Sequence, residues 1–428
     1  MKVYSILLFA LVISSAAQSQ DIDKLINTSE VERIEKIISA DDMQGRRSFT
    51  SGLEKAGDFI SNEFKVAGLK TLDNSGNFRQ TFTMVKAKTI SASGSFDGQA
   101  LDEKNLIFIS TRPELTVTEK SGYEKVQIKA GENIRAVISN YIQAKKNYIV
   151  LIDTSFSKLF PRLAGLKNQQ FKSDYNTVFI LTVADPKQFE LQNRQEITES
   201  SLSNIVGVLP GKSKPQEYVI FSAHYDHLGV TRPNAQGDSI FNGANDDASG
   251  STAVIMLANY FAAKKDNART IVFATFAAEE IGGYGSQYFS RQFDPAQVVA
   301  MFNIEMIGTE SKWGTNSAYI TGYERTDMGK ILEKNLAGSR FTFHPDPYTE
   351  QNLFFRSDNA TLARQGVPAH SLSTSKMDSE KFYHTVGDEI GTLDLKNMTE
   401  IIKAIAISST SIVAGNDTPS RVDVKELK

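Results

Sequence analysis

The sequence contains no cysteine among its 428 residues. A disulfide framework, a thiolate zinc site and a cysteine nucleophile are therefore all excluded, and any metal ion must be held by histidine, aspartate or glutamate. Histidine is scarce as well, with five residues in the whole chain, so a site that needs imidazole has few candidates.

An excess of charge of one sign is also absent. The chain has 47 basic and 50 acidic residues, for a net charge of −3, which gives no electrostatic reason to expect a nucleic acid or an anionic membrane as a partner. Small or neutral substrates fit this balance better.

Long apolar runs are missing too. The N-terminal apolar run, residues 6–13, is far shorter than the roughly 20 residues that a membrane span requires. Because it follows Lys2 and precedes the small residues at 14–17, it predicts a cleavable signal peptide over residues 1–19 and a secreted or periplasmic protein. No later segment is apolar enough to predict a membrane span.

The length favours one large domain with a smaller accessory domain. Apolar residues at helical spacing predict N-terminal helices of the main domain over residues 20–80, and short apolar runs predict an inserted β-rich domain at 81–203. From 204 to 415 apolar runs alternate with helical patterns, which is typical of an α/β fold with a mixed central sheet flanked by helices. Residues 416–428 are interpreted as a C-terminal tail.

Polar side chains follow the predicted strands of this main domain, where ligands bind in open α/β sheets. The patterns predict a helix at 251–265 and strands at 218–223, 270–277, 301–307, 318–322 and 368–373. His224 and Asp226 follow the first strand, Glu279 and Glu280 follow the second, and Glu305 lies in the third. We expect these side chains to lie close together.

Two more carboxylates, Asp246 and Asp247, lie in a glycine-flanked turn before the predicted helix. So many carboxylates at one edge would repel one another without compensating positive charge. Two divalent cations would supply that charge. Their positive charge equals the negative charge of Asp246, Glu280, Glu305 and one hydroxide. Asp246 can bridge the two ions.

Such a site also needs imidazole ligands. His224 is followed two residues later by Asp226, a spacing that lets a second carboxylate orient the ring through its other nitrogen. For the second imidazole we favour His384, because His370 lies in an apolar strand and His344 in a proline-rich loop.

A set of strings in fixed order resembles the dizinc aminopeptidase family that includes aminopeptidase S and aminopeptidase Y. Its members here are NIVGVLPG, SAHYDHLG, GANDDASG, TFAAEEIGGYGS, NIEMIG, RSDN and FYHT, spread over residues 204–400, and ISADDMQGRRSFTSG resembles the N-terminal segment of the family. Glutamate carboxypeptidase II, glutaminyl cyclase and the transferrin receptor are more distant relatives.

The resemblance implies a zinc exopeptidase fold and a role for each matching residue. His224 and Glu305 would bind one zinc ion, Glu280 and His384 the other, and Asp246 would bridge them, with cobalt or manganese as alternatives. Glu279 would be the general base, and Tyr383 would stabilise the oxyanion. The substrate would be a peptide with a free N-terminus, and the inserted domain would correspond to a protease-associated domain.

The chain departs from the family at two positions. Glu305 stands where most members have aspartate, and Asn359 replaces a histidine in an SDH string. His227 is interpreted as a hydrogen-bonded loop residue. A carboxypeptidase, a glutaminyl cyclase and an inactive binding protein remain as alternatives, although every ligand position is filled by a competent residue.

Overall fold

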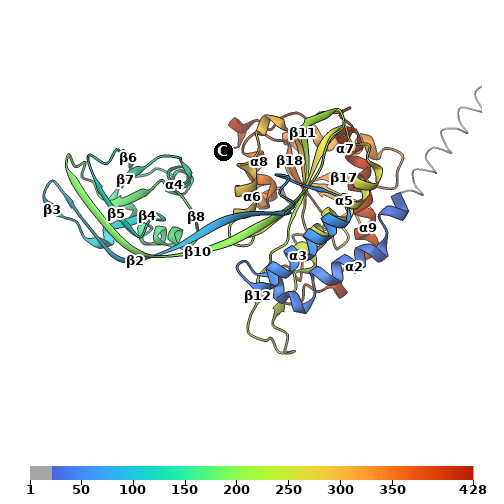
Figure 1. Cartoon of the computed structure of the whole chain (residues 1–428), viewed down its shortest axis with the longest axis horizontal. Helices are drawn as coiled ribbons and strands as arrows, with labels where there is room; N and C mark the ends of the chain where they lie inside the picture. Colours follow the sequence, from blue (N-terminus) through green and yellow to red (C-terminus); the bar gives the residue numbers. More distant parts are fainter. Residues whose placement is uncertain (1–21, 428) are drawn as a thin grey trace, which may run out of the picture. The chain divides into compact units, whose positions relative to one another are not determined.

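The structure, a computed structural model, describes residues 22–427, so the predicted signal peptide lies outside the described residues. Two compact units are present. The larger unit comprises the chain up to Thr81 and from Leu202 onward, and the inserted unit comprises Phe82–Ser201. Two long strands, β2 (Arg79–Phe96) and β10 (Phe189–Leu209), each begin in one unit and end in the other (Figure 1). The boundaries expected at 81 and 203 fall inside these strands.

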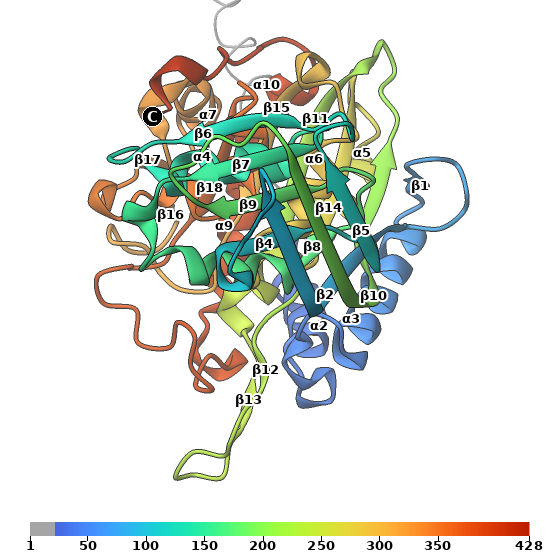
Figure 2. The same ribbon diagram turned by 90° about the vertical axis from the view of Figure 1, so that its left-hand side faces the viewer.

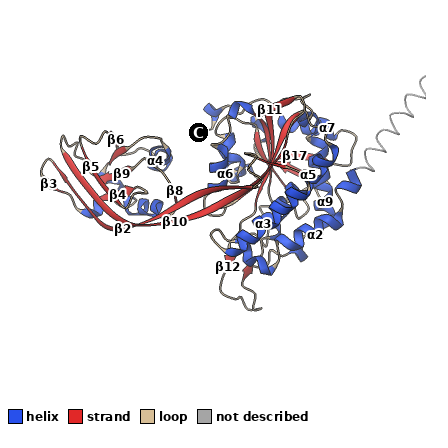
Figure 3. Cartoon of the chain, in the orientation of Figure 1, coloured by secondary structure: helices blue, strands red, loops and turns tan. Residues whose placement is uncertain are grey.

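The larger unit is built around a mixed sheet flanked by helices (Figure 3). The strand order of this sheet is β17-β16-β18-β15-β11-β14-β10-β2. Strands β14, β11, β15 and β18 are parallel, whereas β10 and β16 run antiparallel to their neighbours β14 and β18. The bounds are β11 (Lys214–His224), β14 (Arg269–Phe276), β15 (Val298–Ile304), β16 (Ser317–Ile320), β17 (Thr342–Pro345) and β18 (Ala369–Ser373).

Helices cover both faces of this sheet, which is why its central strands are near-continuous apolar runs. Alternate residues of a strand point to opposite faces. Phe221 stacks on Phe261 of α5 (Ser249–Lys264) with ring centroids 5.4 Å apart, whereas Ile220 packs in a cluster with Phe289 of α6 (Tyr284–Ser290) and Leu362 of α8 (Asn359–Ala363). The predicted α/β class with a mixed sheet is confirmed.

The remaining long helices lie beside α5. They are α2 (Thr28–Ile38), α3 (Ser51–Val66) and α9 (Leu395–Ser408), with α7 (Met328–Leu336) packed on α9. A short hairpin of β12 (Gly229–Val230) and β13 (Ile240–Phe241) connects the end of β11 to the turn before α5. Among the described residues, no helix has the length and apolar character needed to cross a bilayer.

The inserted unit contains a four-stranded sheet in the order β4-β9-β7-β6 (Figure 2). Its strands are β4 (Leu106–Ile109), β6 (Glu124–Ile128), β7 (Tyr148–Ile152) and β9 (Thr177–Leu181), and β6, β7 and β9 are parallel. Because parallel neighbours need a crossover, helix α4 (Ile134–Gln143) connects β6 to β7. The correspondence to a protease-associated domain stays a prediction.

Candidate metal centre

Three neighbouring parallel strands carry most of the candidate site at their carboxyl ends. His224 is the last residue of β11, Glu305 follows directly after β15, and Glu279 and Glu280 lie in the turn after β14. Because β14, β11 and β15 are adjacent and parallel, their ends meet at one edge of the sheet. The predicted convergence of these four side chains therefore follows from the strand order.

Asp246 reaches the same edge from the turn Ala244–Ala248 before α5. The carboxylate of Asp388 fixes this turn, because its two oxygens accept the main-chain N–H groups of Asn245 and Asp246 at 2.8 and 3.0 Å. The first turn of α5, which follows directly, approaches β15 so closely that a side chain on Gly250 would collide with the carbonyl oxygen of Ile304. Asp246 is thereby held between the strand ends.

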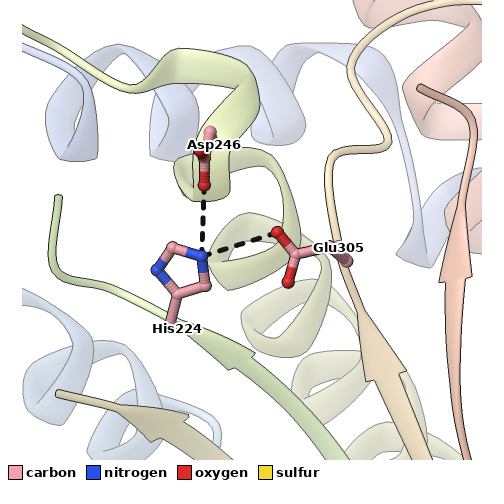
Figure 4. A group of neighbouring side chains, drawn as sticks. All are labelled: His224, Asp246 and Glu305. Carbon is pink, nitrogen blue, oxygen red and sulfur yellow. Dashed lines mark ion pairs between the residues drawn. The ribbon is translucent and has the colours of Figure 1, made fainter. Parts of the chain in front are cut away.

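The carboxylate of Asp246 faces two separate pairs of side chains, each made of one histidine and one glutamate. Its Oδ1 lies 3.2 Å from Nε2 of His224, which is also 3.5 Å from Oε1 of Glu305 (Figure 4). Its Oδ2 lies 3.2 Å from Nε2 of His384, and the same nitrogen is 3.2 Å from Oε2 of Glu280. The five candidate ligands thus form two groups that share Asp246.

The orientation of His224 differs from the expectation. Its Nδ1 lies 3.0 Å from the main-chain carbonyl oxygen of Asp226, whereas the nearer carboxylate oxygen of Asp226 is 3.9 Å away. The carboxylate instead accepts the N–H of Glu279 at 3.0 Å and the hydroxyl of Ser48 at 3.1 Å. The prediction that the Asp226 carboxylate orients the ring was therefore wrong, since the turn after β11 presents the carbonyl to it.

The other carboxylate of the turn, Asp247, connects the elements that carry the site. It accepts the main-chain N–H groups of His224 at 3.2 Å, Gly250 at 3.1 Å and Met306 at 3.0 Å. These donors belong to the end of β11, the start of α5 and the residue after Glu305. Asp247 therefore fixes the backbone around the site rather than facing its centre.

The electrostatics of the cluster call for positive charge. Hydrogen bonds to Asp246 and Glu280 raise the pKa of His384 to about 10. Burial opposes ionisation of Asp246, but hydrogen bonds from His224 and His384 outweigh it and hold the pKa of Asp246 below its usual value. Burial also raises the pKa of Asp358, at the edge of the cluster, to about 7. A divalent cation would supply this charge and leave both imidazoles neutral.

The donor set fits such an ion. All five ligands offer imidazole nitrogen or carboxylate oxygen, which suits zinc, cobalt and manganese. His224 and Asp246 are nearly inaccessible to solvent, whereas the His384 side chain is 37% exposed. The cluster is therefore open on the side of His384.

Tyr383 and a pocket adjoin this open side. The Tyr383 ring stacks on the His384 ring, with centroids 3.9 Å apart and an interplanar angle of 20°. Glu305 and Tyr383 also border a pocket whose wall includes Tyr319, Leu353, Arg356 and Met377. The pocket therefore meets the cluster at Glu305 and Tyr383.

Two residues of this region were not predicted to take part in the site, although His227 was interpreted as a hydrogen-bonded loop residue. Nδ1 of His227 lies 2.7 Å from Oε1 of Glu280, and the buried Arg46 contacts the loops that carry His224 and Asp246. Both belong to strings that carry the family resemblance, and that was the one signal in the sequence.

Imidazoles and carboxylates gathered at the carboxyl ends of parallel strands define a candidate centre for divalent cations. The comparisons with known proteins agree with this class. Residues 204–408 match the model of Peptidase family M28.

Curated relatives match shorter stretches. A probable zinc metalloprotease of Pyrenophora teres f. teres is 37% identical over 118 residues, which are 27% of this chain and 25% of that protein. Leucine aminopeptidase 1 of Emericella nidulans is 28% identical over 212 residues, covering 47% of this chain and 53% of that protein. The chain thus spans about a quarter to a half of the length of these relatives.

Solved structures share the fold over nearly the whole chain. An aminopeptidase from Aneurinibacillus sp. strain AM-1 has a TM-score of 0.54 at 16% identity and covers 94% of this chain and 97% of its own. A zinc aminopeptidase from Bacillus subtilis has a TM-score of 0.52 at 15% identity, with 93% and 99% covered.

Proposed function

We propose that this protein is an exported aminopeptidase that removes N-terminal residues from peptides. It would use two divalent ions, with zinc favoured over cobalt and manganese. The observation that carries the proposal is the carboxylate of Asp246, whose two oxygens face two different pairs of histidine and glutamate. This is the arrangement that a bridging ligand between two ions requires.

Each ion would have its own pair of ligands besides Asp246. His224 and Glu305 would hold one ion, and Glu280 and His384 would hold the other. Ions held there would lower the pKa of a water molecule and polarise the scissile carbonyl. Three carboxylates and one hydroxide would balance the charge of the two ions.

Glu279 is the proposed general base. It lies next to Glu280 in the turn after β14, and its main-chain N–H is fixed by Asp226. Burial raises the pKa of Glu279 well above its usual value, and negative charge on Asp358 and Glu305 adds to this. A carboxylate with a raised pKa accepts a proton from the attacking water readily and returns it to the leaving amine.

Tyr383 is the proposed donor to the oxyanion. Its ring is held on the face of His384 at the open side of the cluster, and burial raises the pKa of its hydroxyl, so the proton stays available at neutral pH. A neutral donor aimed at developing negative charge stabilises the transition state.

The acidic surroundings favour an aminopeptidase over a carboxypeptidase. A peptide ammonium group gains charge-assisted hydrogen bonds at such a site, whereas a terminal carboxylate would be repelled. Leucine aminopeptidase 1 of Emericella nidulans supports the same reaction. Among the described residues that line the pocket, Arg356 is the one cationic side chain and would suit a carboxylate.

A panel of aminoacyl fluorogenic substrates, assayed on the purified chain with and without a strong chelator, tests the proposal. We expect hydrolysis that stops when the ions are removed and returns when zinc is added, with two ions per chain by elemental analysis. Acetylating the amine of the best substrate should nearly abolish its hydrolysis. Full activity in metal-free protein would refute the metal centre, and equal rates on the acetylated substrate would indicate an endopeptidase.

Export is part of the proposal and rests on the apolar run at 6–13 with its flanking residues. Expression of the full chain in a bacterial host, followed by mass spectrometry of the extracytoplasmic fraction, should find a mature N-terminus after Ala17 or Ser19. A chain that keeps residues 1–19 and stays in the cytoplasm would refute export.

A further inference from the structure

His227 is a buried histidine outside the proposed ligand set, three residues after His224. Its main-chain N–H donates to the carbonyl oxygen of Arg46 at 3.2 Å, and 1% of the residue is exposed. The backbone of His227 is therefore fixed, and its imidazole is enclosed by the protein.

The ring of His227 is enclosed on several sides. A side chain on Gly243 would lie 2.5 Å from its Cδ2 atom, so only glycine fits there. The Phe241 ring packs edge to face with it at a centroid distance of 6.4 Å, and the His384 ring does so at 5.8 Å. Rotation of the imidazole is blocked by these neighbours.

The two ring nitrogens have very different surroundings. Nδ1 lies 2.7 Å from Oε1 of Glu280, while Nε2 is buried without a hydrogen-bond partner among the described residues. A carboxylate accepts hydrogen bonds, so the proton belongs on Nδ1. A proton on Nε2 would place an unpaired donor in the interior, which is costly.

We propose that His227 is a positioning residue for the metal site of Glu280 and His384. Its Nδ1–H holds Oε1 of Glu280, which leaves Oε2 directed toward His384 and Asp246. A hydrogen bond to one carboxylate oxygen orients the other oxygen toward the ion. Hydrogen bonds from residues that surround the ligands orient them in this way in known metal sites. The inference rests on the proposed two-ion function and adds a residue to it.

A direct ligand role is the competing explanation, because His227, Asp246 and Glu280 also lie close enough together to hold an ion. The two explanations differ in which substitutes for His227 will work. Asparagine places an amide N–H near the position of Nδ1 and preserves the hydrogen bond, but an amide is a poor zinc ligand. Leucine fills a similar volume and offers no donor.

The experiment compares H227N and H227L in the full chain. Metal-free protein is titrated with zinc in competition with a chromophoric chelator, so the readout is affinity rather than turnover. We expect H227L to lower the zinc affinity of one of the two sites by roughly 10–100-fold and to leave the affinity of the other site unchanged. H227N should keep both zinc affinities near those of the wild type.

The matched control uses His370, another fully buried histidine, whose ring nitrogens contact Thr326 and the carbonyl oxygen of Thr321 instead of site residues. H370L should lower thermal stability without selective loss of one ion. If H227L does not fold, H227Q takes its place, because its amide lies one bond further out and cannot reach Glu280 in the same way.

Each outcome decides the matter. Wild-type zinc affinities in H227L would overturn the proposal while leaving the two-ion function intact, and an equal loss in H227N and H227L would overturn it in favour of a direct ligand. A wild-type chain that binds no zinc would overturn both this inference and the proposed function.

Discussion

Arg46 donates from Nε to the main-chain carbonyl oxygen of Tyr225 at 2.8 Å, one residue after the candidate ligand His224. The same guanidinium donates to the carbonyl oxygens of Ile38, Asn242 and Gly243 at 2.5–3.0 Å. It is fully buried. One side chain from the N-terminal segment therefore fixes both the turn after β11 and the approach to Asp246.

Arg46→Met should destabilise the protein severely, because several buried carbonyl groups lose their donors at once. We expect a loss of at least about 3 kcal/mol in the free energy of unfolding, measured by urea denaturation of metal-free protein. Arg46→Lys should recover only part of this, since a single ammonium group cannot reproduce the planar fork. The exposed neighbour Arg47 is the control, and Arg47→Met should change stability by less than about 0.5 kcal/mol. Equal losses in the two methionine variants would contradict the assignment.

Glu279→Gln should separate metal binding from turnover. Gln cannot accept the proton of the attacking water, so the rate should fall by about 10²–10⁴-fold, while zinc content by elemental analysis stays at the wild-type value. If zinc content falls with the rate, Glu279 is a ligand and its role must be exchanged with that of Glu280.

Glu305 tests the departure from the usual aspartate. Its Oε1 faces His224 at 3.5 Å, and its Oε2 accepts the hydroxyl of Ser357 at 2.5 Å. Glu305→Ala should weaken zinc binding at the proposed site that contains His224. The proposed site that contains Glu280 and His384 should lose less affinity, as measured by zinc titration. Glu305→Asp restores the charge with a shorter side chain and should recover part of the affinity. Two ions bound with wild-type affinity in the alanine variant would remove Glu305 from the site.

Glu35 gives the protein a pH-dependent stability. It is fully buried, its Oε2 accepts the hydroxyl of Thr252 at 2.7 Å, and burial raises its pKa from 4.5 to about 8. The folded state binds this proton more tightly than the unfolded state, so its contribution is complete below pH 4.5 and is lost as the pH rises toward 8.

The matching experiment compares the wild type with Glu35→Gln, which is neutral at every pH. The variant should gain relative stability between pH 5 and 8 by about 1.4 kcal/mol for each pH unit at most, measured by urea denaturation. A difference between the two proteins that does not change with pH would show that Glu35 is ionised in the folded state.

The sequence predicts the centre of the larger unit well because burial leaves a simple pattern there. The strand expected at 270–277 is β14 (Arg269–Phe276), and the helix expected at 251–265 is α5 (Ser249–Lys264). Both are buried nearly throughout, so their apolar residues mark their limits. The long strand β10 was not predicted as one element, because its stretch at residues 196–201 is mostly polar and partly or fully exposed, as in a loop.

The side chains of the centre were easier to foresee than their hydrogen bonds. Residue type and strand order suffice to bring His224, Glu280 and Glu305 to one edge. Whether Asp226 offers its carboxylate or its carbonyl to His224 depends on the local turn, which no spacing rule specifies. The contact of His227 with Glu280 depends on how two separate turns pack, and it leaves no trace in the pattern.

The path of the chain through β2 and β10 makes the inserted unit a separable module. The two strands are neighbours in the sheet, and at the boundary the hydroxyls of Thr81 and Ser203 lie 2.9 Å apart. An excision of residues 82–201 would therefore leave two ends that a tight hairpin turn can join without moving the sheet. In evolutionary terms, gain, exchange or loss of this module requires a change at a single loop, because every candidate ligand is encoded outside residues 82–201.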